Sequence, residues 1–242
     1  MPEPAPSVFA TTHWTLVLSA RDGDREPAAG ALAQLCGTYW PPLYAYLRRQ
    51  GTHPAEAEDL VQGFFEQFLS KDYLRDVARE KGRFRSFLLA SLRHFVANHH
   101  RDRKTQRRGG ALPHFTLDEP GARERCESAA AAAVPPEITY DRLWAATVME
   151  RAARGLRAEY LETGRGKLFE VLRTWLAREP QAGEYSRIAP DLGMSEGALA
   201  VAVLRLRRRF RERIRHEVAQ TVATPEDISG EMRHLLEVLT TG

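Results

Sequence analysis

Apolar side chains recur every three or four positions along most of this chain, and stretches of alternating apolar and polar residues are nearly absent. The first spacing is typical of an amphipathic α-helix and the second of a half-buried β-strand. The pattern therefore predicts an all-α fold. We expect helices over residues 27–50, 54–69, from 82, 140–162 and 167–178, a short helix around 14–18, a compact helical unit over 184–217 and a last helix from 224.

Glycine and proline divide this pattern into domains. Residues 109–136 contain three glycines, four prolines and a run of alanines, a composition that favours a linker, although the alanines could form one short helix. We expect a tail and short helix over 1–26, a helical domain over 27–108, a flexible linker over 109–137, a second helical domain over 138–217 and an extension helix over 218–242. Pro41 and Pro42 predict a kink or break in the helix over 27–50.

The helix from residue 82 has an apolar face only in its first half. Phe84, Leu88, Leu92 and Phe95 fall within about 80° of arc, whereas Arg93, Arg101 and Lys104 lie on the other side. Beyond Phe95 the helix continues without apolar support. Two interpretations are open: a solvated helix end, or a basic surface along nucleic acid, with Arg and Lys at phosphates and His94, Asn98 or His99 near bases.

Charge is distributed unevenly and strengthens the second interpretation. Residues 82–108 carry a net +7 and residues 197–215 a net +6, whereas the whole chain carries +3, which leaves −10 for the remainder. Two basic segments on an otherwise acidic chain are typical of a polyanion ligand held at two places.

The second basic segment follows a helix-turn-helix pattern. The stretch "EYSRIAPDLGMSEGALAVAVLRLRRRF" places small Ala189 four residues before Gly193 at the turn, and Ser195 as N-cap of the next helix. Leu199, Val203, Leu206 and Phe210 form the expected buried stripe of that helix. The expected outward face, suited to a major groove, comprises Gly197, Val201, Leu204, Arg205 and Arg208. Pro190 is unexpected inside the first helix.

The helix over 54–69 presents a narrow polar stripe of Asp59, Gln62 and Glu66, with Phe65 about 60° to its side. An acidic stripe beside an exposed aromatic side chain favours a protein-partner site. The alternative is a solvated face with Phe65 in the core.

Other classes of function lack sequence support. No run of about 18 apolar residues spans a membrane, the N-terminus does not match a secretory signal, and two distant cysteines form no disulfide framework, so a cytoplasmic protein is expected. A hydrolase built on His94, His99 and Asp102 would lack a nucleophile motif, a phosphate loop and metal-ligand spacing. We expect no enzyme activity, no cofactor and no metal.

Four of these segments, in order, resemble the extracytoplasmic-function sigma factors of bacterial RNA polymerase. "AEDLVQGFFEQFL" (57–69) resembles the polymerase-binding segment and "LCGTYWPPLYAYLRR" (35–49) the helix before it. "GRFRSFLLASLRHFVANHHRDRKTQRR" (82–108) resembles the promoter-melting segment. "YSRIAPDLGMSEGALAVAVLRLRRRFR" (185–211) resembles the C-terminal helix-turn-helix.

The resemblance implies a subunit that guides core polymerase to promoters and helps to open the duplex. It implies polymerase contact through Asp59, Leu60, Gln62, Phe65 and Glu66, and capture of a flipped base by the loop over 71–83. It implies −10 DNA contact through Arg83, Arg85, Arg93, His94, Asn98, Arg101 and Lys104. It implies −35 DNA contact through Ser195, Gly197, Val201, Leu204, Arg205 and Arg208.

The sequence leaves alternatives for −35 specificity, for regulation and for the role of the C-terminal helix. The family commonly carries a Lys and an Arg where this chain has Ala200 and Ala202, so phosphate contact is expected to dominate −35 binding. An anti-sigma protein or another regulator is a further partner of such factors. The helix after residue 224 has three possible roles: a docking surface for such a partner, a built-in regulator or a packing element. The alternative function is a helix-turn-helix regulator that never meets polymerase.

Overall fold

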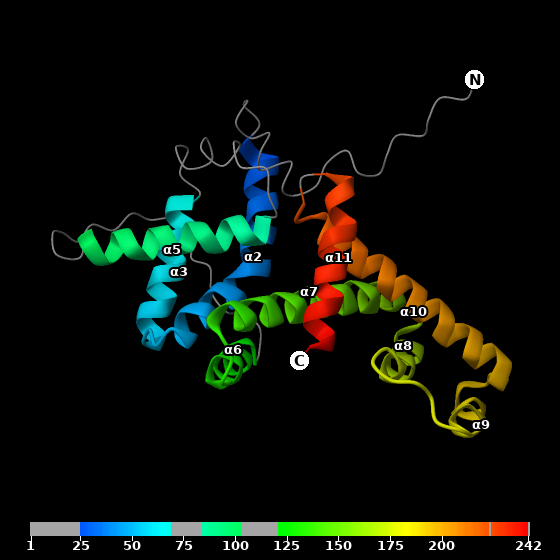
Figure 1. Ribbon diagram of the computed structural model, residues 1–242. Helices are drawn as coiled ribbons and strands as arrows, with labels where there is room; N and C mark the ends of the chain where they lie inside the picture. The colour runs from blue at the N-terminus through cyan, green and yellow to red at the C-terminus, as the bar shows by residue number, and fades with distance from the viewer. Residues whose placement is uncertain (1–24, 69–83, 103–120, 223, 242) are drawn as a thin grey trace. The chain divides into compact units, whose positions relative to one another are not determined.

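The computed structural model describes residues 25–68, 84–102, 121–222 and 224–241, and within these ranges every regular element is helical, without a strand (Figure 1). The all-α prediction is confirmed. The chain divides into two compact units. Unit 1 comprises Met1–Thr147 and Val218–Gly242, and unit 2 comprises Val148–Glu217.

Unit 1 is built from α2 (Arg25–Arg49), α3 (Pro54–Phe68), α5 (Phe84–Asp102), α6 (Ala122–Ala131), the first part of α7 (Pro136–Glu162) and α11 (Pro225–Thr240). Its core is rich in aromatic side chains. The ring of Tyr39 on α2 meets Phe84 on α5 edge-on, with centroids 5.0 Å apart, and Phe64 on α3 contacts Phe95 on α5 at 5.8 Å. Such contacts bury large areas and join α2, α3 and α5.

Unit 2 contains the rest of α7, α8 (Gly166–Leu172), the 3-10 turn η2 (Arg173–Trp175), α9 (Glu184–Ile188), the 3-10 turn η3 (Pro190–Leu192) and most of α10 (Glu196–Ala219). Its core is smaller. Leu156, Phe169, Leu172, Trp175, Leu199 and Leu206 are buried.

The expected helices are found with shifts of a few residues at their ends, but the segment 14–18 lies outside the described residues. Across Pro41 and Pro42 the helix bends rather than breaks, and α2 continues to Arg49 (Figure 1). Leu43 and Tyr44, which follow the prolines, are fully buried. The burial of these two side chains compensates for the backbone hydrogen bonds that the two prolines cannot make.

The second half of the expected linker is structured. Helix α6 packs against α2, where the Glu127 carboxylate accepts hydrogen bonds from Tyr44 at 2.5 Å and from Arg48 Nε at 2.8 Å. The Arg49 guanidinium donates to the Val134 carbonyl at 2.6 Å. The prediction of a flexible linker up to residue 137 is therefore wrong from Gly121 onward, and residues 103–120 lie outside the described part.

The C-terminal segment is also part of unit 1 rather than an appended helix. Val218, Ile228 and Leu235 are at most 1% exposed, so they belong to its core. The division between the units falls inside α7 and inside α10. Unit 2 is therefore inserted into unit 1 in sequence, which differs from two domains in tandem.

Both cysteines lie in unit 1 as free, buried thiols. Burial raises the pKa of the Cys36 thiol well above its usual range. Cys126 lies on α6, where its Sγ contacts the Pro41 carbonyl oxygen at 3.7 Å.

Candidate nucleic-acid interface

The turn between α9 and α10 is tight and locally determined. Pro190 does not interrupt α9; it opens the 3-10 turn η3, where its missing amide hydrogen needs no partner. Gly193 adopts a left-handed backbone, with φ of 62°, and the Met194 amide donates to the Ala189 carbonyl at 3.0 Å. Ser195 then caps α10, since its Oγ accepts from the Ala198 amide at 3.2 Å.

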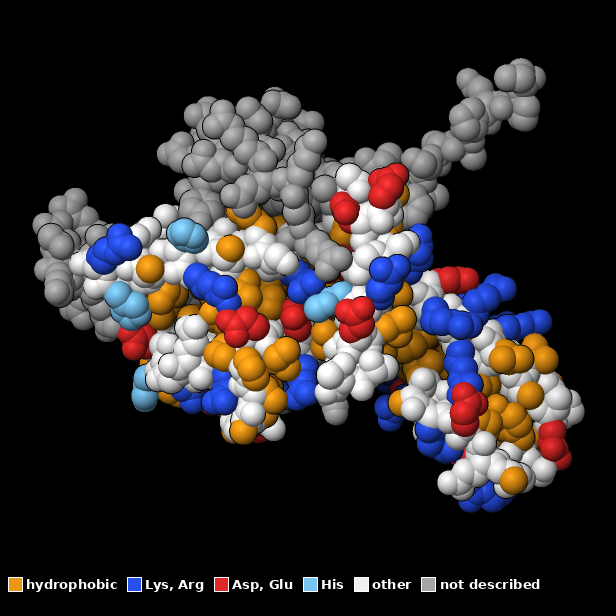
Figure 2. All heavy atoms as spheres, viewed as in Figure 1, with side chains coloured by type: hydrophobic (Ala, Val, Ile, Leu, Met, Phe, Trp, Pro, Cys, Tyr) orange, Lys and Arg blue, Asp and Glu red, His pale blue; other side chains and the backbone are white. Residues whose placement is uncertain are grey.

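Helix α10 has the two faces that its sequence predicts. The stripe of Leu199, Val203, Leu206 and Phe210 is buried. On the other side Val201 is 45% and Leu204 64% exposed, and Gly197, Arg205 and Arg208 are exposed with them. Figure 2 shows Lys and Arg side chains gathered along this helix with apolar side chains beside them. Large apolar groups exposed between arginines can meet thymine methyls and base edges in a groove.

Three arginines of α10 serve the fold of unit 2. Arg207 donates to the carbonyl oxygens of Trp175 at 2.8 Å and Arg178 at 2.7 Å, and it pairs with the Glu179 carboxylate. Arg209 and Arg213 both pair with Glu159 on α7. The +6 charge of this segment is therefore not a uniform ligand surface.

Helix α9 is held at its start by an ion pair. Both terminal nitrogens of the Arg178 guanidinium donate hydrogen bonds to the Glu184 carboxylate, at 2.5 and 2.8 Å. The Gln181 backbone amide donates to the same carboxylate at 2.9 Å. Glu184 is only 8% exposed. These hydrogen bonds, with that from Arg178 the largest cause, hold the pKa of the Glu184 carboxyl well below its usual range.

Glu184→Gln is expected to destabilise unit 2 at neutral pH and to have less effect in acid. A lowered carboxyl pKa contributes stability above the ordinary value of about 4.3, and that contribution is lost as pH falls toward the lowered pKa. Melting curves of both proteins should therefore converge below about pH 4. Glu162→Gln, at an exposed site, is the matched control and should follow the wild type. A gap that stays constant down to about pH 3 would contradict the assignment.

The far end of α5 exposes the polar side chains expected there. His94, Asn98 and Arg101 are exposed. Arg93 is also exposed, but its Nε donates to the Tyr46 hydroxyl at 2.8 Å and its guanidinium pairs with Glu137. Arg83 and Lys104 lie outside the described residues.

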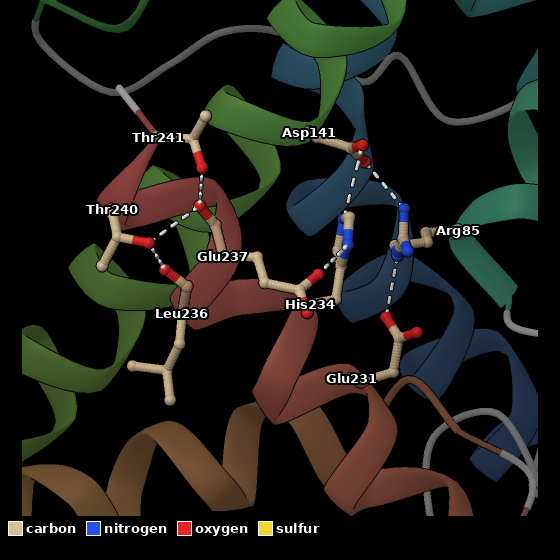
Figure 3. Close-up of polar contacts among 8 residues, drawn as sticks. All are labelled: Arg85, Asp141, Glu231, His234, Leu236, Glu237, Thr240 and Thr241. Carbon is tan, nitrogen blue, oxygen red and sulfur yellow. Dashed lines mark hydrogen bonds and ion pairs between the residues drawn. The ribbon is translucent and has the colours of Figure 1, made fainter.

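Arg85 is only 7% exposed, which contradicts the sequence expectation that this side chain contacts DNA. Its Nε pairs with Glu231 on α11 at 2.8 Å, and its Nη1 pairs with Asp141 on α7 at 2.7 Å (Figure 3). The Tyr140 hydroxyl donates to the Arg85 carbonyl at 3.0 Å, and His234 lies 3.3 Å from Asp141. We call Arg85, Asp141, Glu231 and His234 the Arg85 cluster; it joins three helices of unit 1.

The expected polymerase-binding set on α3 is only partly accessible. Leu60 is 2% and Phe65 1% exposed, so both belong to the core and the expectation of an exposed Phe65 is wrong. Asp59 is exposed, whereas Gln62 and Glu66 are half-buried and hydrogen-bond to each other at 3.2 Å. The loop over 71–83 lies outside the described residues.

Sequence reasoning missed the Arg85 cluster, although a local signal was present. Arg85 falls about 20° from Leu92 on the helical wheel, at the edge of the apolar stripe, and Glu231 lies about 40° from Leu235. A charged residue beside an apolar stripe favours a buried pair, but the periodicity does not name its partner.

Comparison of the chain with protein-family models, with curated proteins and with solved structures gives no match. Within the described ranges no three His, Cys, Asp or Glu side chains gather in a way that would hold a metal ion. No helix among the described residues has the length and apolar character needed to cross a membrane.

Proposed function

We propose that this chain is a promoter-recognition subunit of a bacterial RNA polymerase, similar to the extracytoplasmic-function sigma factors. The observation that carries the proposal is the outward face of α10, where Val201, Leu204, Arg205 and Arg208 are exposed directly after a tight, capped turn. A helix presented in this way suits the major groove, with its first turns at base edges. Unit 2 would read the upstream promoter element.

Unit 1 supplies the second surface of the proposal. The end of α5 exposes His94, Asn98 and Arg101, which combine base-edge hydrogen bonding with positive charge. Arg85 is excluded from this surface because it is buried in the Arg85 cluster. The proposed −10 contact therefore rests on the second half of α5.

The accessible polar side chains of α3 are the proposed polymerase contact. Asp59 is exposed, and Gln62 and Glu66 extend it along the helix. The burial of Phe65 favours the alternative function, a DNA-binding regulator that does not meet polymerase, because the surface has lost its aromatic component. The two functions differ in one measurable property, association with core polymerase.

The variant Asp59→Lys/Gln62→Ala/Glu66→Lys is expected to abolish co-purification with core polymerase and to leave duplex DNA binding unchanged. Reversing the charge of an acidic patch places it against a surface of the same charge on the partner, and this repulsion lowers the affinity. Gln67→Lys is the control, because Gln67 is exposed on the same helix about 80° from Asp59. Wild-type levels of polymerase in the triple variant would exclude α3 as the contact and favour the alternative.

Transcription in vitro tests the function as a whole. Core polymerase, the purified chain and fragmented genomic DNA are expected to yield transcripts that begin downstream of a shared sequence. Absence of any initiation, together with absence of association in gel filtration, would contradict the proposed function.

A further inference from the structure

Helix α10 continues for many residues beyond its proposed base-reading turns, and its outward face stays basic. Arg211 and Arg215 are exposed. On the helical wheel they lie within about 80° of arc together with Val201, Leu204 and Arg208. The proposed reading face and these two arginines therefore form one continuous stripe.

These two side chains differ from the other arginines of the same helix. Arg207, Arg209 and Arg213 are held by carboxylates and carbonyl groups of unit 2. No partner for Arg211 or Arg215 is found in the described part of the chain. The exposed pair between Arg208 and Glu212, at 3.4 Å, is of a kind that contributes little to stability. The fold therefore leaves Arg211 and Arg215 unengaged while it uses their neighbours.

Helix polarity does not account for the position of Arg211. Basic side chains stabilise a helix by its dipole only within the last turn. Helix α10 ends at Ala219, two turns after Arg211.

The length of α10 determines what this part of the stripe can meet. Val201 and Arg215 are separated by about 21 Å along a helix axis. The major groove is about 12 Å wide and 8.5 Å deep, so a straight helix whose first turns lie at its floor emerges at the rim. The rim is lined by phosphates, which guanidinium groups bind through paired hydrogen bonds.

We propose that Arg211 and Arg215 form a phosphate-binding track that anchors the second half of α10 to the backbone of the duplex. The inference rests on the proposed function, because it requires the first turns of α10 to enter the groove. The track fixes the orientation of the helix on DNA and carries no sequence information. It adds affinity for any duplex and raises the dependence of that affinity on salt.

The test compares full-length wild type with Arg211→Ala/Arg215→Ala, using fluorescence anisotropy on a mixed-sequence DNA duplex over a salt series. Each phosphate contact contributes about 0.9 to the slope of log affinity against log salt. The slope is therefore expected to fall by about 1.8, and between about 50 and 200 mM salt the wild type should lose roughly 12-fold more affinity than the variant loses. Arg211→Lys/Arg215→Lys keeps both charges and should keep most of the slope.

The control variant is Arg157→Ala/Arg173→Ala. It removes the same charge from unit 2 at two exposed arginines that pair with Glu170. Its slope should stay near that of the wild type, because both guanidinium groups pair with a carboxylate of the protein and neither belongs to the α10 stripe.

Three outcomes separate the inference from the proposed function. A wild-type slope in the alanine variant, with normal DNA binding, would overturn the track and leave the proposed function intact. Losses that depend on the DNA sequence would overturn phosphate contact in favour of base contact. No duplex binding by the wild type at any salt concentration would overturn both.

Discussion

Arg85→Ala is expected to lower the free energy of unfolding of unit 1 by about 3–5 kcal/mol, the cost typical of removing one partner from a buried ion pair. The partner left behind, Glu231, is 2% exposed, so water cannot replace the guanidinium. Asp141 loses its arginine partner at the same time and keeps only the neighbouring His234 among the residues of the cluster. The loss should appear as earlier denaturant unfolding and as faster amide exchange in α5 and α11.

Two further variants separate the buried pair from a general effect of arginine removal. Arg93→Ala, which removes an exposed ion pair with Glu137 and a hydrogen bond to the Tyr46 hydroxyl, should cost about 1–2 kcal/mol. Arg85→Met/Glu231→Leu replaces both charged partners with apolar groups and should recover most of the lost stability. Equal, small effects of Arg85→Ala and Arg93→Ala would show that the Arg85 cluster is not buried in solution.

Ending the chain after Glu217 is expected to unfold unit 1. The truncation removes Val218, Ile228 and Leu235, and burial of each such side chain contributes about 1.5–3 kcal/mol. It also removes Glu231, which leaves Arg85 buried without one of its two carboxylates. The combined loss is comparable with the whole stability of a typical domain, about 5–15 kcal/mol.

The measurement is amide hydrogen exchange of the truncated chain. Protection should be lost in α2, α3 and α5, whereas α8 and α9 of unit 2 should retain part of theirs. A chain that ends after Glu237 is the control, since it removes exposed Leu239 and the last turn of α11 only. Full protection of α5 in the shorter chain would show that the C-terminal segment is a dispensable extension.

The sequence predicted the elements and faces that depend on local periodicity. The apolar positions of α10 recur along one side, and the structure buries that side and exposes Val201 and Leu204. The same holds for Phe84, Leu88 and Leu92 on α5. Gly193 placed the turn before α10, because the backbone preference of glycine acts within a few residues. Pro190, unexpected inside a helix, starts the 3-10 turn η3 instead.

The sequence could not predict contacts that depend on distant partners. Arg85 pairs with a residue 146 positions away, and periodicity carries no such information. Phe65 is buried on α3 together with Phe64 and Phe68. The buried face of α3 is therefore broader than the apolar stripe that periodicity predicts, and its width depends on the helices that pack against it. The docking of α6 likewise depends on Arg48 and Glu127, 79 residues apart in the chain.

The buried thiols of unit 1 make the folded protein well suited to site-directed chemistry. Both native cysteines are only 1% exposed, so a maleimide or a disulfide-forming probe would find neither thiol readily. A cysteine introduced at Val201 would then be the one readily modified thiol. Cross-linking from that single position could map which nucleotides lie against α10 without any alteration of the native cysteines.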